Sequence, residues 1–201
     1  NLANEEVTAD GHCVRCGRPV EKKNLKQWFF RITQYADRLL KDLDLLEGWP
    51  EKVRQMQANW IGKSQGAKVT FKVTETGDDC PVYTTRPDTI FGVTFMAIAP
   101  DHPLLKKLLP GSPREAEVKA FAEKLANIPA AERFSDALAK EGVFTGFHVT
   151  NPYNGDTDIQ LWVTNYVVSD SGTGIVMAVP THDQRDWDFA TKYGIPKKIV
   201  I

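Results

Sequence analysis

Short apolar segments with the two-residue periodicity of β-strands recur through the last two-thirds of the chain. Apolar and polar residues alternate at 69–73, which predicts a half-buried strand. The apolar run 93–99 predicts a strand buried on both faces. An Asn-Gly pair at 154–155 is a strong signal for a hairpin between two further strands. The predicted strands are 69–73, 81–85, 93–99, 147–149, 159–163, 166–169 and 175–179.

The long connections between these strands carry helical patterns, so the sheet is expected to be covered by helices. With 201 residues the chain can bury one sizeable core. We therefore predict a mixed α/β fold: a β-barrel-like mixed sheet surrounded by helices, with a small N-terminal appendage that combines helices and a zinc knuckle. The helices predicted in the connections are 103–109, 113–126 and 130–140.

The first 65 residues have a different pattern and form the predicted appendage. Helical periodicity begins at Asn24, a suitable N-cap, and ends at the Gly-Trp-Pro sequence 48–50. A second helix with Pro50 at its first position is expected to bury Val53, Met56 and Trp60. The predicted domains are a partial zinc-ribbon knuckle at 1–23, a helical linker at 24–65 and the main domain at 66–201.

Three cysteines make a poor disulfide framework, which indicates a reducing, cytoplasmic location. Cys13 and Cys16 form a C-x-x-C pair, a candidate metal or redox element, although two ordinary reduced thiols explain it equally well. A structural zinc ion requires four ligands. The pair offers two, and His12 is a doubtful third.

Charge and hydropathy exclude two classes of protein. The chain has 25 Lys and Arg against 26 Asp and Glu, so it is not a strongly basic nucleic-acid binder, although a local basic patch remains compatible with RNA contact. Its apolar runs are too short to span a bilayer, and its first residues lack a signal-peptide core. The start at Asn1 without methionine suggests a piece of a larger protein.

Threonines gather where the strand 81–85 ends. Their hydroxyls both donate and accept hydrogen bonds, and their β-branched side chains form small, stiff walls that can admit one aliphatic shape and exclude another. Threonine is also common in ordinary strands and turns. Arg86 is suited to bind a phosphate or carboxylate, or to pair with Asp88. The three threonines are Thr84, Thr85 and Thr89, in the segment TTRPDT.

A second polar segment follows the strand 175–179. A helix is predicted from Thr181, which forms a capping box with Gln184. Asp183 and Asp186 lie on one face of its first turns, where a carboxylate could bind a substrate ammonium. Acidic residues in a first turn are also ordinary partners of the helix dipole, which is the more expected role of Asp183. His182 suits a hydrogen-bonding role at a helix start better than that of a general base. The predicted core face comprises Trp187, Phe189, Ala190 and Tyr193, and Gly194 ends the helix.

The sequence lacks the common signatures of covalent catalysis and nucleotide binding. It has no G-x-S-x-G elbow, no H-E-x-x-H, no P-loop and no Rossmann fingerprint. A hydrolase built on these segments would position water and polarise a carbonyl, without a covalent intermediate.

The segments 84–89, 172–174 and 182–186 together resemble the editing domain of leucyl-tRNA synthetase, bacterial forms in particular. The sister enzymes for valine and isoleucine usually carry Glu or Trp in place of Asp88. The run WIGKS at 60–64 resembles the junction where this insertion leaves the synthetase body. The resemblance covers nearly the whole chain and identifies 66–201 as the editing domain, which in the family continues past the last residue of this chain.

The resemblance implies post-transfer editing, the hydrolysis of the aminoacyl ester of misacylated tRNA(Leu). The misattached amino acids are isoleucine and those with valine-like or norvaline-like side chains. Such proofreading is needed because a pocket separates aliphatic side chains of similar size by only about 1–3 kcal/mol, as known from synthetases of this class.

The resemblance also implies roles for individual residues. Thr84 and Thr85 would hold the ribose and ester and stabilise the oxyanion, and Asp186 would bind the α-ammonium. The methyl of Thr89 would collide with leucine and so spare the correct product. The further substrate-binding residues would be Arg86, Asp88, Met177, Val179, His182 and Arg185.

Cofactors and partners follow from the same resemblance. Editing needs no metal, ATP and magnesium belong to the synthetic domain, and zinc at Cys13 and Cys16 would be completed by ligands of the full-length parent. The expected partner is the 3′ end of tRNA(Leu), bound by a monomer. Two alternatives remain: a non-catalytic module that docks the tRNA 3′ end, and a zinc-ribbon fragment that binds nucleic acid.

Overall fold

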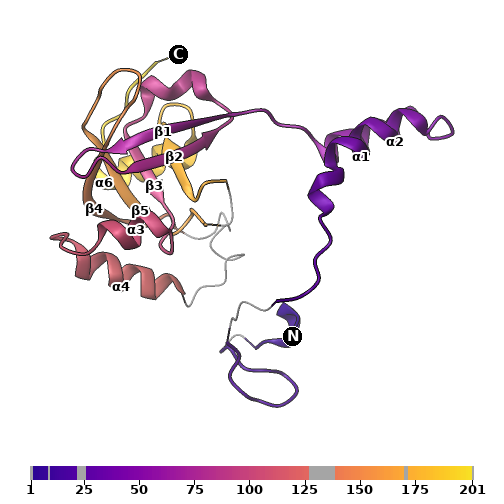
Figure 1. Cartoon of the computed structure of the whole chain (residues 1–201), viewed down its shortest axis with the longest axis horizontal. Helices are drawn as coiled ribbons and strands as arrows, with labels where there is room; N and C mark the ends of the chain where they lie inside the picture. Colours follow the sequence, from indigo (N-terminus) through magenta and orange to yellow (C-terminus); the bar gives the residue numbers. More distant parts are fainter. Residues whose placement is uncertain (1, 9, 22–25, 127–138, 170–171, 201) are drawn as a thin grey trace. The chain divides into compact units, whose positions relative to one another are not determined.

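The computed structural model describes all residues except 1, 9, 22–25, 127–138, 170–171 and 201 (Figure 1). The chain divides into two compact units, Asn1–Lys63 and Ser64–Ile201. Across the described residues, no helix has both the length and the apolar character that a bilayer crossing requires.

The first unit is made of short helices whose apolar residues are exposed. The helix predicted from Asn24 is wrong in its first part: residues 26–31 are not helical, and the regular helix α1 begins only at Ala36. Short helices gain most of their stability by packing an apolar face, and here Trp28 and Trp60 remain exposed, as do Val53 and Met56. The helices are η1 (Asn4–Glu6), η2 (Ile32–Tyr35), α1 (Ala36–Asp42), η3 (Leu43–Leu45) and α2 (Glu51–Ile61).

The second unit is a six-stranded mixed sheet with helices around it. The strands lie in the order β2-β1-β4-β5-β3-β6, and among the described pairs only β3 and β5 run parallel. The strands are β1 (Ala67–Val73), β2 (Asp79–Thr84), β3 (Phe95–Ile98), β4 (Gly142–Thr150), β5 (Ile159–Thr164) and β6 (Ile175–Ala178). The helices are η4 (Pro87–Gly92), α3 (Pro103–Leu108), α4 (Glu115–Ala126) and α6 (Gln184–Tyr193).

The mixed α/β prediction is confirmed, but the predicted barrel-like closure is wrong because the sheet is open. The edge strands β2 and β6 lie close to each other. In the described part of the chain, however, no ladder of hydrogen bonds joins them. β6 has only four residues and ends just before Val179 and Pro180, so little strand is available to close the sheet.

The central strand β3 is buried on both faces, as its sequence predicts. Met96 and Ile98 belong to a core cluster that includes Leu105 of α3 and Val118 of α4. Phe95 and Ala97 point to the other face, where Phe95 stacks on Phe189 of α6 with 5.0 Å between ring centroids. α6 therefore packs on the face of β3 opposite to the one covered by α3 and α4.

One predicted strand is wrong, and one predicted helix cannot be compared with the structure. Residues 166–169 do not form the predicted strand: the Asn165 amide nitrogen donates to the Glu141 carbonyl and its side chain donates to the Ala139 carbonyl. These bonds hold the chain in a loop, in which Tyr166 is buried without strand pairing. The helix predicted at 130–140 lies almost wholly outside the described residues.

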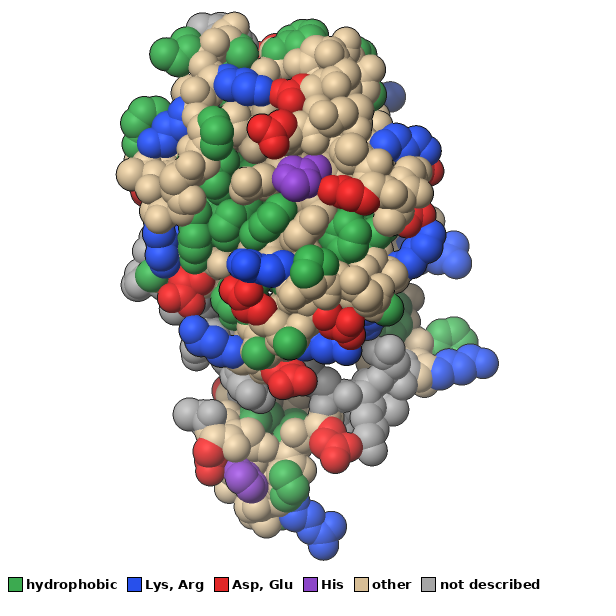
Figure 2. Space-filling model, turned by 90° about the vertical axis from the view of Figure 1, so that its left-hand side faces the viewer, with side chains coloured by type: hydrophobic (Ala, Val, Ile, Leu, Met, Phe, Trp, Pro, Cys, Tyr) green, Lys and Arg blue, Asp and Glu red, His purple; other side chains and the backbone are tan. Residues whose placement is uncertain are grey.

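The surface has no area dominated by one charge on the face shown in Figure 2, where acidic and basic side chains are interspersed. This agrees with the formal net charge of −1. Binding to a polyanion would therefore depend on local features of a site rather than on the field of the whole molecule.

Candidate active site

A pocket of about 280 Å³ lies where the two edges of the open sheet approach each other. One wall comes from the end of β2 and from η4, and the other from β6 and the start of α6. Nine of the ten residues predicted for catalysis or substrate binding line it; Asp88 does not. The lining residues are Tyr83, Thr84, Thr85, Arg86, Thr89, Val176, Met177, Val179, His182, Asp183, Arg185 and Asp186.

Two threonine hydroxyls at the end of β2 are available to a ligand. The Thr84 oxygen accepts a hydrogen bond from the Arg86 amide at 3.0 Å, which leaves its own proton free to donate. Thr85 is exposed, and its hydroxyl has no hydrogen-bond partner among the described residues. Both hydroxyls can therefore donate to an oxygen atom held in the pocket.

Thr89 presents an apolar group to the same pocket. Its side chain is buried, with the residue only 2% exposed, and its hydroxyl donates to the Arg86 carbonyl at 2.9 Å. Because this bond fixes the hydroxyl and β-branching restricts the rotamer, the methyl group is the part of the side chain left to contact a ligand.

Arg86 and Asp88 form an ion pair across the first turn of η4. The Arg86 guanidinium donates from Nε and Nη2 to the Asp88 carboxylate at 2.8–3.1 Å. This hydrogen bonding lowers the pKa of Asp88 and raises that of Arg86. Asp88 thus braces the Arg86 side chain at the rim without lining the pocket itself.

Asp186 is a buried carboxylate in the opposite wall, with the residue only 6% exposed. Its Oδ2 accepts from the Val179 amide at 2.9 Å, and in the described chain its Oδ1 has no such partner. Burial and then the charge of Asp183 raise the pKa of Asp186 to about 7, against the opposing effects of the Val179 amide and Arg185. A cation in the pocket would gain a strong partner in this under-satisfied carboxylate.

Asp183 holds Asp186 in place by capping α6. Its side chain accepts from the amides of Arg185 at 2.9 Å and Asp186 at 3.2 Å. The predicted capping box from Thr181 is therefore wrong: the Thr181 hydroxyl donates to the Lys198 carbonyl instead. Gly194 ends the helix in the left-handed conformation, as predicted.

Three lining residues were not among the predicted site residues: Tyr83, Val176 and Asp183. Tyr83 precedes the threonines on β2, and Val176 precedes Met177 on β6. Strand alternation assigns only one of two successive residues to a given face. It could not show that both Val176 and Met177 reach a pocket at the open edge of the sheet.

The Gly-Thr-Gly segment before β6 is anchored by His102. Its Nδ1 accepts from the Leu104 amide at 3.0 Å, which caps α3, and so its Nε2 carries the proton and donates to the Thr173 carbonyl at 3.0 Å. Gly174 has a φ of +72°, and a Cβ there would lie 2.8 Å from the His102 ring. This close contact requires glycine and fixes the approach to β6.

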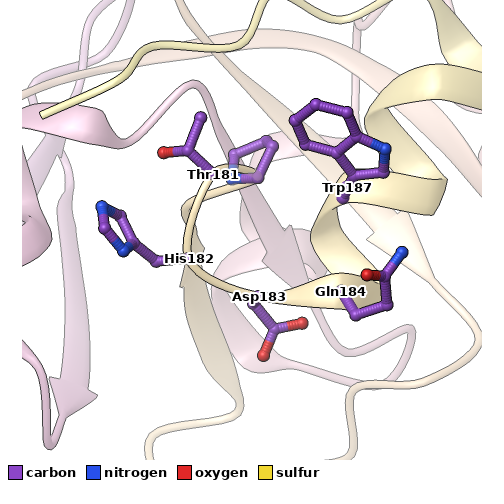
Figure 3. A pocket seen from close by; sticks show the side chains of 6 residues that line it. Thr181, His182, Asp183, Gln184 and Trp187 are labelled. Atoms are coloured by element: carbon purple, nitrogen blue, oxygen red, sulfur yellow. The ribbon is translucent and has the colours of Figure 1, made fainter. Parts of the chain in front are cut away.

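A second hollow of about 400 Å³ adjoins the first along the loop 180–183, and His182 and Asp183 line both. Figure 3 shows this loop running between His182 and Trp187. Trp187 was predicted in the core but is 43% exposed, and the Lys197 ammonium lies 3.9 Å from its ring centroid. The His182 Nε2 is buried without a partner in the described chain.

The cysteine pair lies in the first unit. Cys13 is buried, Cys16 is exposed, and neither forms a disulfide. Hydrogen bonds from the amides of Arg15 and Cys16 lower the pKa of the Cys13 thiol. His12 is engaged by Asp10 through Nδ1. Within the described residues no three potential metal ligands gather, so the donors there do not complete a zinc site, and the predicted half-site stays a prediction.

Comparison with known families gives one match over most of the chain. The family described as "Leucyl-tRNA synthetase, editing domain" matches residues 58–201. In a solved structure described as the ternary complex of Agrobacterium radiobacter K84 agnB2 LeuRS-tRNA-LeuAMS, the similar chain is 44% identical with a TM-score of 0.73. The match covers 99% of this chain and 24% of that one.

Curated relatives are similar over the full length of the chain. A leucine–tRNA ligase of Symbiobacterium thermophilum is 57% identical over 205 residues, and one of Nitratidesulfovibrio vulgaris is 54% identical over 201 residues. Each match covers 100% of this chain and 24% of the relative. The chain thus spans about a quarter of the length of these relatives.

Proposed function

The chain belongs to the editing-domain family of leucyl-tRNA synthetase, and on this premise we propose that its pocket hydrolyses the aminoacyl ester of misacylated tRNA(Leu). The observation that carries the proposal is the juxtaposition, in one pocket, of a buried carboxylate, free threonine hydroxyls and a threonine methyl. These groups match the three parts of an aminoacyl ester: its ammonium, its carbonyl and ribose, and its side chain.

The carboxylate and the hydroxyls would position the substrate. The open Oδ1 of Asp186 accepts a hydrogen bond from the α-ammonium, and the cation restores the ionised form that burial disfavours. Thr84 and Thr85 donate to the ribose and the ester carbonyl. Their hydrogen bonds strengthen as negative charge develops on the carbonyl oxygen, so they stabilise the transition state for attack by water.

Thr89 would decide which side chain is accepted. Its methyl narrows the pocket where the branched end of leucine would lie, whereas isoleucine and valine-like or norvaline-like side chains fit differently. One methyl group in such a pocket is worth about 1–3 kcal/mol, which is enough to spare the correct product. Met177 and Val179 complete the apolar lining, and Arg86, His182 and Arg185 contact the RNA end.

Incubating the chain separately with isoleucyl-tRNA(Leu) and leucyl-tRNA(Leu) tests the proposal. We expect release of isoleucine and retention of leucine, measured as loss of radiolabelled ester over time. Binding of both tRNAs without release of either amino acid would instead show a docking module and contradict the proposal.

The zinc-ribbon alternative predicts a different result. One tightly bound zinc ion per chain, together with RNA binding that is lost when Cys13 and Cys16 are changed to serine, would support that reading. We propose that zinc at this pair, where present, depends on ligands outside the described residues, and that it takes no part in ester hydrolysis.

A further inference from the structure

We propose that the hollow beside Trp187 is a second subsite, which binds the base of the nucleotide that precedes the terminal adenosine of the tRNA. The inference rests on the proposed function, because it names a further part of the same substrate.

The position of the hollow follows from the helix that separates it from the first pocket. Asp186 and Trp187 are successive residues of α6, so their side chains point about 100° apart around the helix. Asp186 points into the ester pocket, and Trp187 lines the adjoining hollow. An RNA end whose last nucleotide occupies the first pocket would reach Trp187 by passing His182 and Asp183, the residues that line both hollows.

The chemistry of the hollow suits a nucleobase. An indole that is 43% exposed offers a flat surface for stacking, which is how single-stranded RNA ends are commonly held. The Lys197 ammonium lies over one face of the ring and places a positive charge beside the indole, which suits a polyanionic ligand.

A polar side chain beside the indole, Gln184, can contact the edge of the base. The amide nitrogen of Gln184 donates to Asp188, so its carbonyl oxygen remains available to an exocyclic amine. Because the 3′ end of tRNA is CCA, the base in question is cytosine.

The direct test compares two probes, adenosine and the dinucleotide cytidylyl-adenosine, by calorimetry on the 201-residue chain. We expect the dinucleotide to bind more tightly by about 5- to 150-fold, the range that stacking of one base supports. Trp187→Ala should remove this gain and leave adenosine binding unchanged, whereas Trp187→Phe should keep most of it. Trp60→Ala, which removes another exposed indole, is the matched control.

A kinetic test separates the two proposals. Trp187→Ala should raise KM for isoleucyl-tRNA(Leu) by the same factor as it weakens dinucleotide binding, with kcat unchanged. Hydrolysis of isoleucyl-adenosine, which is too short to reach the hollow, should not change. Equal binding of the two probes to the parent chain would overturn the subsite, as would an equal effect of the variant on long and short substrates. Failure of the parent to cleave either ester would instead contradict the proposed function.

Discussion

At the scale of single residues, the site combines groups that would be unfavourable elsewhere. Asp186 is a buried carboxylate with one oxygen unpartnered in the described chain, and the Thr85 hydroxyl has no partner there. Such groups reduce stability, and proteins retain them where a ligand completes their hydrogen bonds. Thr89 and Asp186, which line opposite walls of the pocket, give testable predictions.

The first concerns the methyl group of Thr89. Thr89→Ser removes the methyl and keeps the hydroxyl, so hydrolysis of leucyl-tRNA(Leu) should rise by about 10- to 200-fold. Thr89→Val keeps a methyl group in the same place and loses the bond to Arg86, so leucine should still be spared. If Ser and Val variants discriminate equally well, the methyl group is not the selective element.

The second concerns the ionisation of Asp186. Its pKa is raised to about 7, so its neutral form stabilises the fold at low pH, and this contribution is lost as pH rises from about 4 through about 7. At pH 8 the free energy of unfolding of Asp186→Asn should therefore exceed that of the parent by about 1–4 kcal/mol, as measured by urea titration. Below pH 4 the two proteins should be about equally stable.

Asp186→Asn should lower the rate of hydrolysis although it raises stability. Asn cannot offer a charge to the substrate ammonium, so hydrolysis of isoleucyl-tRNA(Leu) should fall at all pH values, whereas parent turnover should rise through pH 7. A variant that is more stable and equally active would remove Asp186 from the site.

At the scale of secondary structure, the site depends on contacts that join elements distant in sequence. His102 precedes α3, yet its ring holds the segment before β6 through Thr173. The amide of Ala99 adds a second bond, to the Gly174 carbonyl. Together these bonds fix where β6 begins, and hence where Met177 lies in the pocket.

This arrangement predicts that His102→Ala destabilises the chain by about 1–3 kcal/mol, through loss of the helix cap and of the Thr173 bond. His102→Asn should keep the helix cap but not the Thr173 bond, so its stability should lie between those of the parent and His102→Ala. Burial lowers the pKa of His102, and protonation would remove the acceptor for Leu104. Its contribution is thus fully present above the unfolded-state pKa of 6.5 and is lost as the pH falls from there to the lower folded-state pKa, as urea titrations of parent and Asn variant at several pH values would show.

Sequence periodicity correctly predicted strands whose side chains pack into the core clusters. The alternation at 69–73 identified β1, and the apolar run at 93–99 contains the doubly buried β3. Gly194 marked the end of α6 because its left-handed conformation is a local property. The pattern failed at Tyr166, where burial comes from a loop, and at Thr181, whose hydroxyl bonds to Lys198 far along the chain.

The site shows the same limit. Residue types suggested that the threonines and a carboxylate at 183 or 186 could bind a ligand. Only the family resemblance selected Asp186 and indicated that these groups act together. The two segments lie about 100 residues apart, and they meet because the sheet brings β2 and β6 near each other. Spacing alone cannot predict a contact that depends on the curvature of a whole sheet.

At the scale of the whole molecule, the two units differ in how they bury apolar surface. Both core clusters belong to the second unit, Ser64–Ile201. The first unit exposes many large apolar side chains, which marks a surface suited to covering by other polypeptide. The exposed aromatic residues of this unit are Trp28, Phe29, Phe30, Tyr35, Trp49 and Trp60.

This division predicts that residues 64–201 fold without the first unit. Deleting residues 1–63 should shift the thermal midpoint of the main transition by about 4 °C or less, because no core side chain is removed. Binding of a hydrophobic dye should fall, since the exposed aromatic residues are lost. A shortened chain without a cooperative transition, followed by circular dichroism, would show that the first unit contributes to the core.

The missing ladder between β2 and β6 has a mechanical consequence. A closed ring of strands would set a fixed spacing between the threonines and Asp186, whereas an unbonded seam takes its width from the packing behind it. Substitutions deep in the core, remote from the ester, can then change which amino acid is admitted. If the proposed function holds, the selectivity of hydrolysis would accordingly change with mutations that never touch the substrate.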